Sequence, residues 1–199
     1  MNNAARERIL RAGAAIMHVK GFQGTGLAEV LAAAHAPKGS FYHYFPSKEA
    51  FGLAVLAHFE EGLGAMGQEV LALPGLSAQA RLDALVERFR EFFAGRGYTL
   101  GCPIGKLAQE MGDLSEAFQQ HLAARPTPLT RIMAAIIAQG QAEGDFDPGL
   151  EAEEAARFLA GAWQGALIRM KVERGPGPLT LFTRYAKRLL ATSGETPTP

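Results

Sequence analysis

The sequence has a single cysteine, Cys102, among its 199 residues. One cysteine cannot form a disulfide within the chain, and it cannot build a cysteine-based zinc cage. Apolar runs are short as well, because none approaches the ~18 residues that a membrane-spanning helix needs. The N-terminus has a basic start but lacks the apolar core and cleavage site of a secretory signal. We therefore expect a cytoplasmic protein that has no membrane partner.

Patterns typical of catalysis and metal binding are also missing. The histidines show no pairing at the helical spacing of metal ligands, so we expect neither a metal nor a cofactor. There is no nucleophile elbow and no glycine-rich phosphate loop after a strand. His58, Glu60 and Glu61 are better explained as an exposed helix face. We predict that the chain is not an enzyme; a helical adaptor that binds no DNA is a further alternative.

The charge of the whole chain hides a local imbalance. The formal net charge is zero, but residues 1–50 hold six Lys or Arg and only three Asp or Glu, a local charge of +3. A hydrophobic content of 48% is ample for a packed core. Apolar residues recur at helical spacing almost throughout, and no segment alternates as a strand does. These patterns predict an all-α protein with a basic N-terminal part.

Residues 25–51 predict a function more directly than any other segment. Two short helical patterns flank a break at residues 35–36. Thr25 is predicted to be the N-cap of the first helix, and Pro37 the first residue of the second, where its missing N–H costs nothing. This arrangement is typical of a helix-turn-helix, whose second helix enters the major groove of double-stranded DNA.

The second of these helices is built for exposure rather than burial. Phe41 and Phe45 are four residues apart, so we expect them to anchor the helix inward and turn its polar side chains outward. Pro46 ends the helix, Ser47 can cap the next one, and Lys48 in that first turn can hold a phosphate. The predicted DNA contacts are Thr25, Lys38, Gly39, Ser40, Tyr42, His43 and Lys48.

This segment resembles the DNA-binding signature of TetR-type repressors, in which a capped helix and a turn precede G-S-x-Y-x-H/Y-F-x-x-K-E-x-[LF]. The matching positions are Gly39, Ser40, Tyr42, Tyr44, Phe45, Lys48, Glu49 and Phe51. The turn departs from the pattern, since the chain has Ala-His-Ala at residues 34–36 where many members have Ala-Gly-Val. The resemblance implies a repressor that dimerises through its final helices, binds a palindromic operator and answers to a small-molecule inducer.

We predict three parts in the chain. A helix-turn-helix DNA-binding domain of three helices covers residues 1–46, a helical regulatory and dimerisation domain covers residues 47–193, and a disordered tail covers residues 194–199. A long helix from about Ser47 toward Leu73 joins the first two parts, so its tilt can couple them. The other predicted helices contain residues 9–20, 82–93, 114–144 with a break at Pro126 and Pro128, 155–170 and 182–190.

The last two predicted helices carry more small residues than a single core needs, namely Ala160, Gly161, Ala162, Gly165 and Ala166. Small residues let helices approach closely, which favours a four-helix interface built from two copies of the pair. A core within one chain is the alternative. One recognition helix covers only a few base pairs, and a twofold dimer reads two half-sites about one helical turn (~34 Å) apart. The DNA-binding argument therefore favours a homodimer.

Cys102 follows a glycine-rich loop and lies at a predicted helix N-terminus, with Pro103 in the first turn. The helix dipole and Lys106, four residues further on, both favour the thiolate form. Thiolates attack electrophiles and oxidants, so this cysteine can act as a chemical sensor. An inert buried cysteine is the alternative. A disulfide within the chain is excluded, which leaves an adduct, a sulfenic acid or an intermolecular disulfide.

The pattern G-C-x-x-x-K-L-x-x-E-x-x-D-L-S-E at residues 101–116 is similar to the NemR-like branch of these repressors, which release DNA when an electrophile or oxidant modifies a cysteine. Cys102 matches the reactive position, and Pro103 directly after it is a departure. Lys171, on the same helix as Trp163, stands where the branch has a lysine; it either reaches solvent or faces a sensor pocket. In the alternative, a small apolar molecule binds noncovalently in a cavity lined by Phe89, Phe93, Met111, Phe118, Trp163 and Met170.

Overall fold

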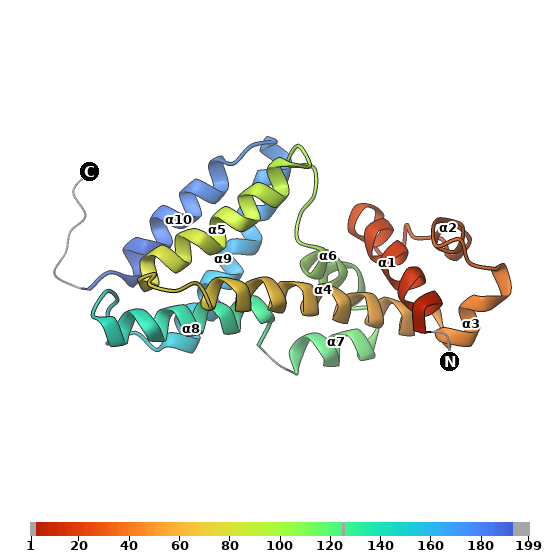
Figure 1. Cartoon of the computed structure of the whole chain (residues 1–199), viewed down its shortest axis with the longest axis horizontal. Coiled ribbons are helices and arrows are strands. Elements are labelled where there is room, and N and C mark those ends of the chain that lie inside the picture. Colours follow the sequence, from red (N-terminus) through yellow and green to blue (C-terminus); the bar gives the residue numbers. More distant parts are fainter. Residues whose placement is uncertain (1–2, 125, 193–199) are drawn as a thin grey trace. The chain divides into compact units, whose positions relative to one another are not determined.

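A computed structural model describes residues 3–124 and 126–192, so the predicted tail at 194–199 lies outside the described residues. Within these ranges the chain is helical and forms no strand, which confirms the all-α prediction (Figure 1). The elements are α1 Asn3–Lys20, α2 Leu27–Ala33, the 3₁₀ turn η1 Lys38–Ser40, α3 Phe41–Tyr44, α4 Lys48–Leu71, α5 Ala78–Ala94, α6 Pro103–Met111, α7 Glu116–Ala123, α8 Pro128–Glu143, α9 Ala152–Glu173 and α10 Gly177–Leu190. None of the helices in the described ranges is long and apolar enough to cross a bilayer.

The described residues form two compact units. The second unit contains the described residues 63–101 and 126–192, and the first unit contains residues 3–62 and 102–124. Helices α6 and α7 therefore belong to the same unit as α1, α2 and α3, although α4 and α5 lie between them along the chain. The functional boundary predicted at residue 46 is a different division, and it stays a prediction.

In the first unit, α1, α2 and the first turns of α4 pack around an aliphatic and aromatic core. Ile9 and Met17 on α1 are buried, as their helical spacing predicts. A β-carbon at Gly13 would lie 2.1 Å from Cζ of Phe51, so α1 and α4 are in close contact there. Helix α1 ends just before Gly21, whose φ of +79° is the left-handed conformation typical of a glycine that follows a helix.

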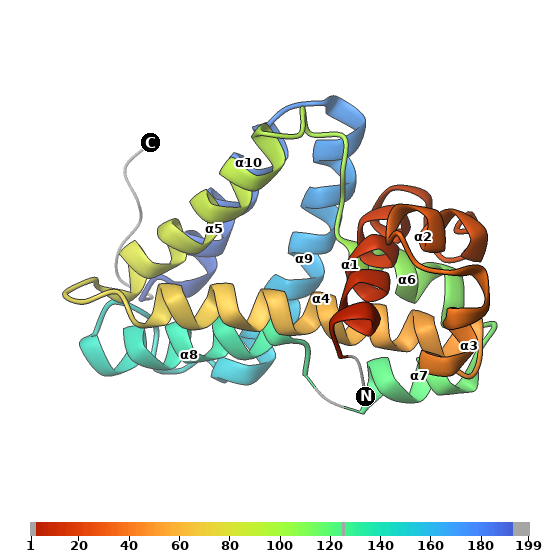
Figure 2. The same ribbon diagram turned by 45° about the vertical axis from the view of Figure 1, so that its right-hand side comes forward.

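In the second unit, α5, α8, α9 and α10 pack against one another. Figure 2 shows α5 and α10 side by side, and α9 contacts both α8 and α10. The indole of Trp163 lies between two phenylalanine rings, with centroid distances of 4.9 Å to Phe89 and 5.0 Å to Phe182. Because Trp163 is almost fully buried, it is part of the core that holds α5, α9 and α10 together.

The predicted helix boundaries agree with the structure in the C-terminal part. Helix α7 ends at Ala123 and α8 begins at Pro128, so the chain breaks where the prolines predict a break. Residues 147–149 form a turn that is closed by a 2.8 Å hydrogen bond from the Gly149 N–H to Asp147 Oδ1. Local capping and turn chemistry accounts for both boundaries.

Candidate nucleic-acid interface and cysteine site

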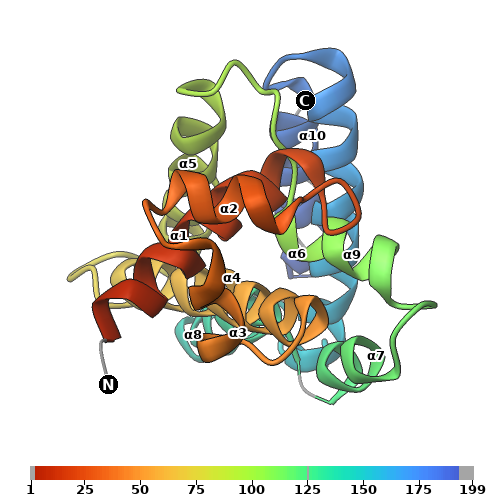
Figure 3. The same ribbon diagram turned by 90° about the vertical axis from the view of Figure 1, so that its right-hand side faces the viewer.

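The turn between α2 and α3 is held by groups that lie far apart along the chain. Arg8 of α1 donates from Nε to the Ala34 carbonyl at 3.4 Å, at the C-terminal end of α2. The next residue, His35, adopts the left-handed conformation with φ of 48°, which is unusual for a residue other than glycine. The chain then passes Pro37 into η1 and α3. Figure 3 shows the loop that leads from α2 to α3.

Two local predictions in this segment are wrong. Helix α2 begins at Leu27 with Gly26 as its N-cap, and Thr25 does not cap it. Thr25 is instead only 1% exposed, because its hydroxyl turns back and donates to the Gly21 carbonyl at 2.6 Å. The Thr25 side chain therefore cannot contact a phosphate. Pro37 is extended, with ψ of 144°, so the helical turn starts one residue later than predicted, at Lys38.

The second helix of the motif is anchored as the phenylalanine spacing predicts. Phe41 and Phe45 are 1% and 2% exposed, and both rings pack against Phe51 of α4. On the opposite side, Tyr42 is 66% exposed, and its ring meets the Phe41 ring edge to face, with 5.3 Å between their centroids. The anchors are therefore aromatic and internal, while the side chain next to Phe41 is free to reach a ligand.

The other predicted DNA contacts surround Tyr42 on η1, α3 and the start of α4. Lys38, Gly39 and His43 are exposed, and a β-carbon at Gly39 would meet no atom within 4 Å. Ser40 is half-buried, and its hydroxyl donates to the Pro37 carbonyl at 2.7 Å. This surface combines one cation, open backbone and two aromatic polar side chains, which suits contacts to phosphates and base edges.

Lys48 lies at the start of α4, as predicted. Ser47 caps that helix by accepting a 3.0 Å hydrogen bond from the Ala50 N–H. The Lys48 ammonium lies 4.8 Å from the centroid of the Phe22 ring, so it is held beside the helix N-terminus by a cation–π contact. A cation placed next to unsatisfied N–H groups is a suitable anion-binding arrangement.

Cys102 is the N-cap of α6, and Pro103 is its first residue, in agreement with the sequence. The sulfur accepts a hydrogen bond from the Gly105 N–H at 3.4 Å, and the residue is half-buried. Lys106 has a partner that the sequence pattern does not disclose. Its ammonium donates to the Val19 carbonyl at 2.7 Å, at the C-terminal end of α1.

The remaining predicted sensor residues belong to the second unit. Trp163 is a core residue, and Lys171 is exposed on α9. The Lys171 side chain passes close to Gly101, because a β-carbon placed on Gly101 would lie 3.9 Å from Lys171 Cδ. The six residues proposed to line an apolar cavity do not gather in one unit. Phe118 is fully buried against Phe22 in the first unit, whereas Trp163 packs in the second.

Sequence reasoning also missed the partners of α6 and α7 within the first unit. Glu110 accepts a 3.1 Å hydrogen bond from the Gln23 N–H, and the Ser115 hydroxyl donates to the Glu49 carboxylate. The spacing of polar residues at positions 101–116 predicts that they share one helix face, but it does not predict which residues that face contacts. In the described part of the chain, no three His, Cys, Asp or Glu side chains are grouped to hold a metal ion.

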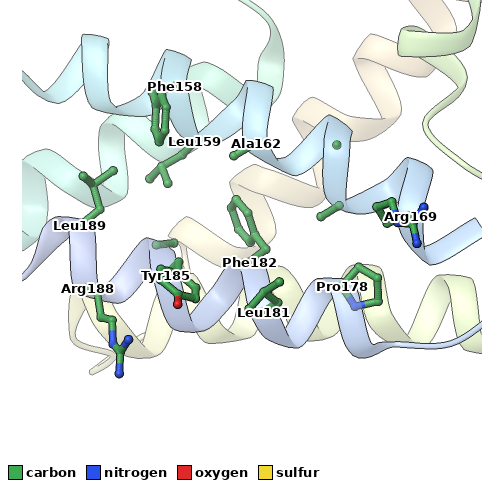
Figure 4. A pocket seen from close by; sticks show the side chains of 13 residues that line it. Phe158, Leu159, Ala162, Arg169, Pro178, Leu181, Phe182, Tyr185, Arg188 and Leu189 are labelled. Atoms are coloured by element: carbon green, nitrogen blue, oxygen red, sulfur yellow. The ribbon is translucent and has the colours of Figure 1, made fainter. Parts of the chain in front are cut away.

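Helices α9 and α10 present apolar side chains to solvent. Phe158 and Tyr185 are 65% and 55% exposed, and Leu181 is 49% exposed. Figure 4 shows these side chains along a groove between the two helices, with Ala162 and Gly165 also among its lining residues. A β-carbon at Gly161 or Gly165 would meet nothing within 4 Å, so a further helix can approach this face closely.

Comparisons with known proteins agree with this architecture. Residues 9–55 match the family model described as bacterial regulatory proteins, tetR family, and residues 78–186 match the tetracyclin repressor-like C-terminal domain. The transcriptional regulator AcuR of Cereibacter sphaeroides is 34% identical over 188 residues, which are 94% of this chain and 86% of AcuR. The repressor NemR of Escherichia coli K12 is 31% identical over 187 residues, 94% of each chain.

Solved structures give the same result. Regulatory protein TetR from Rhodobacter sphaeroides superposes with a TM-score of 0.85 at 33% identity, covering 94% of this chain and 99% of that one. The reduced form of Escherichia coli NemR gives a TM-score of 0.82 at 30% identity, covering 96% and 100%. The chain therefore belongs to the TetR family of transcriptional regulators. It is a DNA-binding repressor, and because this family is non-enzymatic, the enzyme alternative is excluded.

Proposed function

We propose that this repressor binds a palindromic operator as a homodimer and releases it when an electrophile modifies Cys102. The observation that carries the proposal is the place of the cysteine, half-buried at the N-cap of a helix that belongs to the DNA-binding unit. The likeness to NemR, whose structure was solved in a reduced form, supports a thiol-based response.

The DNA contacts come from η1, α3 and the start of α4. Lys38 and Lys48 neutralise phosphates, while Tyr42 and His43 reach base edges, and the bare backbone at Gly39 allows close approach to the duplex. The Thr25 side chain is buried and does not belong to this set. Two copies of α9 and α10 cover each other's apolar faces, so that the dimer presents two recognition helices to two half-sites.

The covalent step is an addition to an α,β-unsaturated carbonyl such as a quinone or a maleimide. The thiol loses its proton to water, and the sulfur forms a C–S bond to the β-carbon. The electron pair of the C=C bond moves to the α-carbon, which takes a proton from water. The adduct places new bulk at the N-cap of α6, where Sγ now accepts the Gly105 N–H. A coupling of ~1–3 kcal/mol would weaken operator affinity by about 5–150-fold.

The test compares the wild-type protein with Cys102→Ser. Serine keeps an acceptor at the N-cap, so the variant should bind DNA as tightly as the wild type. An operator is first selected from a random duplex pool, and its affinity is measured by fluorescence anisotropy before and after N-ethylmaleimide. Mass spectrometry confirms one adduct per chain. We expect release by the wild type alone. Equal release by both proteins would remove Cys102 from the mechanism and favour a noncovalently bound inducer.

A further inference from the structure

We infer that Lys106 and Glu110 are the coupling pair that connects α6 to the DNA-binding helices, an inference that rests on the cysteine-dependent release proposed above. The two residues lie four and eight positions after Cys102, on one face of a nine-residue helix that this cysteine caps. Both bind the same short stretch of chain, the end of α1 and the turn that leads to α2. They act by positioning that turn and do not touch the DNA or the modifying compound.

Lys106 makes the first contact of the pair. Its ammonium donates to the Val19 carbonyl at 2.7 Å, in the last turn of α1. The last carbonyls of a helix have no partner within the helix, and a cation placed there satisfies one of them and opposes the helix dipole. The contact spans 87 positions of sequence, so it ties α6 to α1 directly.

Glu110 makes the second contact, on the turn itself. Its carboxylate accepts a 3.1 Å hydrogen bond from the Gln23 N–H. A β-carbon at Gly21 would lie 1.8 Å from Glu110 Oε1, so this carboxylate occupies the space that any side chain at position 21 would need. The same turn is tied to the start of α2, because the Thr25 hydroxyl donates to the Gly21 carbonyl at 2.6 Å. Movement of Glu110 therefore acts on the turn that positions α2.

A second attachment to the DNA-binding helices lies just beyond the C-terminal end of α6, at the N-cap of α7. The Ser115 hydroxyl donates to the Glu49 carboxylate in the first turn of α4 and also caps α7, accepting the Phe118 N–H at 3.2 Å. Glu49 directly follows Lys48, which the proposed interface uses. In the proposed coupling, a change at Cys102 tilts α6, and Lys106 and Glu110 transmit that tilt to α1.

The experiment uses the full-length dimer and the variants Lys106→Ala and Glu110→Ala, singly and together. Gln109→Ala is the matched control, since Gln109 is exposed on the same helix. Lys106→Arg and Glu110→Gln each keep a donor or an acceptor at the same place and serve as rescue variants. For each protein, the ratio of operator Kd after and before N-ethylmaleimide is measured, together with complete alkylation of Cys102 by mass spectrometry. Hydrogen exchange is followed in a peptide that covers residues 18–26.

We expect the wild type, the Gln109 control and the rescue variants to show the same Kd ratio, about 5–150-fold. In the double alanine variant the ratio should fall to about 1, while its Kd before alkylation stays within a few-fold of wild type. Alkylation should raise exchange at residues 18–26 in the wild type but add nothing in the double variant. An unchanged Kd ratio in the double variant would overturn the coupling role. The same conclusion would follow if alkylation raised hydrogen exchange at residues 18–26 equally in the wild type and the double variant.

Failure of the proposed function is distinguishable from failure of the coupling. If fully alkylated wild type keeps its operator affinity, cysteine-dependent release is wrong. The hydrogen-exchange data then test the connection between α6 and α1 without the DNA-binding data. Faster exchange at residues 18–26 after alkylation, lost in the double variant and restored in the rescue variants, supports a mechanical connection from α6 to α1. An exchange rate that does not respond to alkylation in the wild type rejects that connection.

Discussion

The ring of Phe41 meets the ring of Phe51 edge to face, with 5.2 Å between their centroids and 78° between their planes. This contact joins the recognition segment to α4, and both rings are fully buried. This aromatic contact positions the exposed side chains of η1 and α3. The two rings themselves are buried and cannot contact DNA.

Replacing Phe41 by alanine removes that anchor. Loss of a buried phenylalanine side chain typically lowers the free energy of unfolding by about 3–5 kcal/mol, through lost burial and the cavity left behind. We expect a loss in this range in urea unfolding of Phe41→Ala, together with loss of operator binding. An unfolding free energy within 1 kcal/mol of wild type would contradict the anchoring role.

Tyr42→Ala is the counterpart on the exposed side of the same turn. Tyr42 is 66% exposed, so its removal should change the free energy of unfolding by no more than about 0.5 kcal/mol. Loss of a base-edge contact costs about 1–3 kcal/mol, which corresponds to a 5–150-fold weaker operator complex. Unchanged operator affinity in anisotropy titrations would place Tyr42 outside the interface.

Lys38→Ala should change the salt dependence of DNA binding. Each phosphate neutralised contributes about −0.9 to the slope of log K against log salt concentration. One such contact per subunit makes the slope of the dimer shallower by about 1.8 in the variant. Lys187→Ala is the control, because it removes a lysine that pairs with Asp83 in the second unit. Equal slopes for both variants would show that Lys38 contacts no phosphate.

His35→Gly should stabilise the protein. A side chain in the left-handed region costs roughly 1–2 kcal/mol, and His35 has φ of 48°. Glycine relieves this strain but raises the entropy of the unfolded chain, at a cost of about 0.5–1 kcal/mol, so we expect a net gain of up to about 1.5 kcal/mol. Thermal unfolding should show a higher Tm. Ala36→Gly, at a position without positive φ, should lower the Tm, and a lower Tm in both variants would argue against strain at His35.

Glu143 should make part of the stability depend on pH. Its carboxylate accepts hydrogen bonds from Gln139 Nε2 at 2.6 Å and from the Ala78 N–H at 3.0 Å. The bond from Gln139, followed by the bond from Ala78, holds the pKa of Glu143 below its ordinary value of 4.5. Because the folded-state pKa is depressed, this contribution is complete above pH 4.5 and is lost as the pH falls through the folded-state value.

The measurement for Glu143 is urea unfolding of wild type and Glu143→Gln at several pH values. We expect the wild type to be the more stable protein at pH 7 and the difference between them to shrink steadily below pH 4.5. A difference that does not vary between pH 3 and pH 7 would mean that ionisation of Glu143 makes no contribution to stability.

Leu181→Glu should disrupt the proposed dimer. Leu181 is 49% exposed in the groove between α9 and α10, and a second copy would bury it. A carboxylate there would have to be desolvated without a partner, which strongly disfavours association. Leu114→Glu is the matched control, since Leu114 is 67% exposed in the first unit. Analytical ultracentrifugation should give monomers for Leu181→Glu and dimers for the control; dimers in both would refute this interface.

The sequence by itself determined the helices, many of their ends and the helix-turn-helix pattern. Apolar periodicity, prolines and capping residues act over a few positions, so the inward anchors Phe41 and Phe45 and the cap at Cys102 could be predicted from local spacing. A prediction from local pattern was wrong where a polar side chain had another hydrogen-bond partner close by. Thr25 has the chemistry of an N-cap, but its hydroxyl donates backward to Gly21.

Only the tertiary structure decided what α6 is attached to. Lys106 reaches Val19 across 87 positions, and Ser115 reaches Glu49 across 66. No periodicity within a helix encodes such pairs, because their partners meet only once α1, α4, α6 and α7 have packed into one unit. The sequence identified Lys106 as a neighbour of the cysteine, whereas packing made it a contact of the DNA-binding helices.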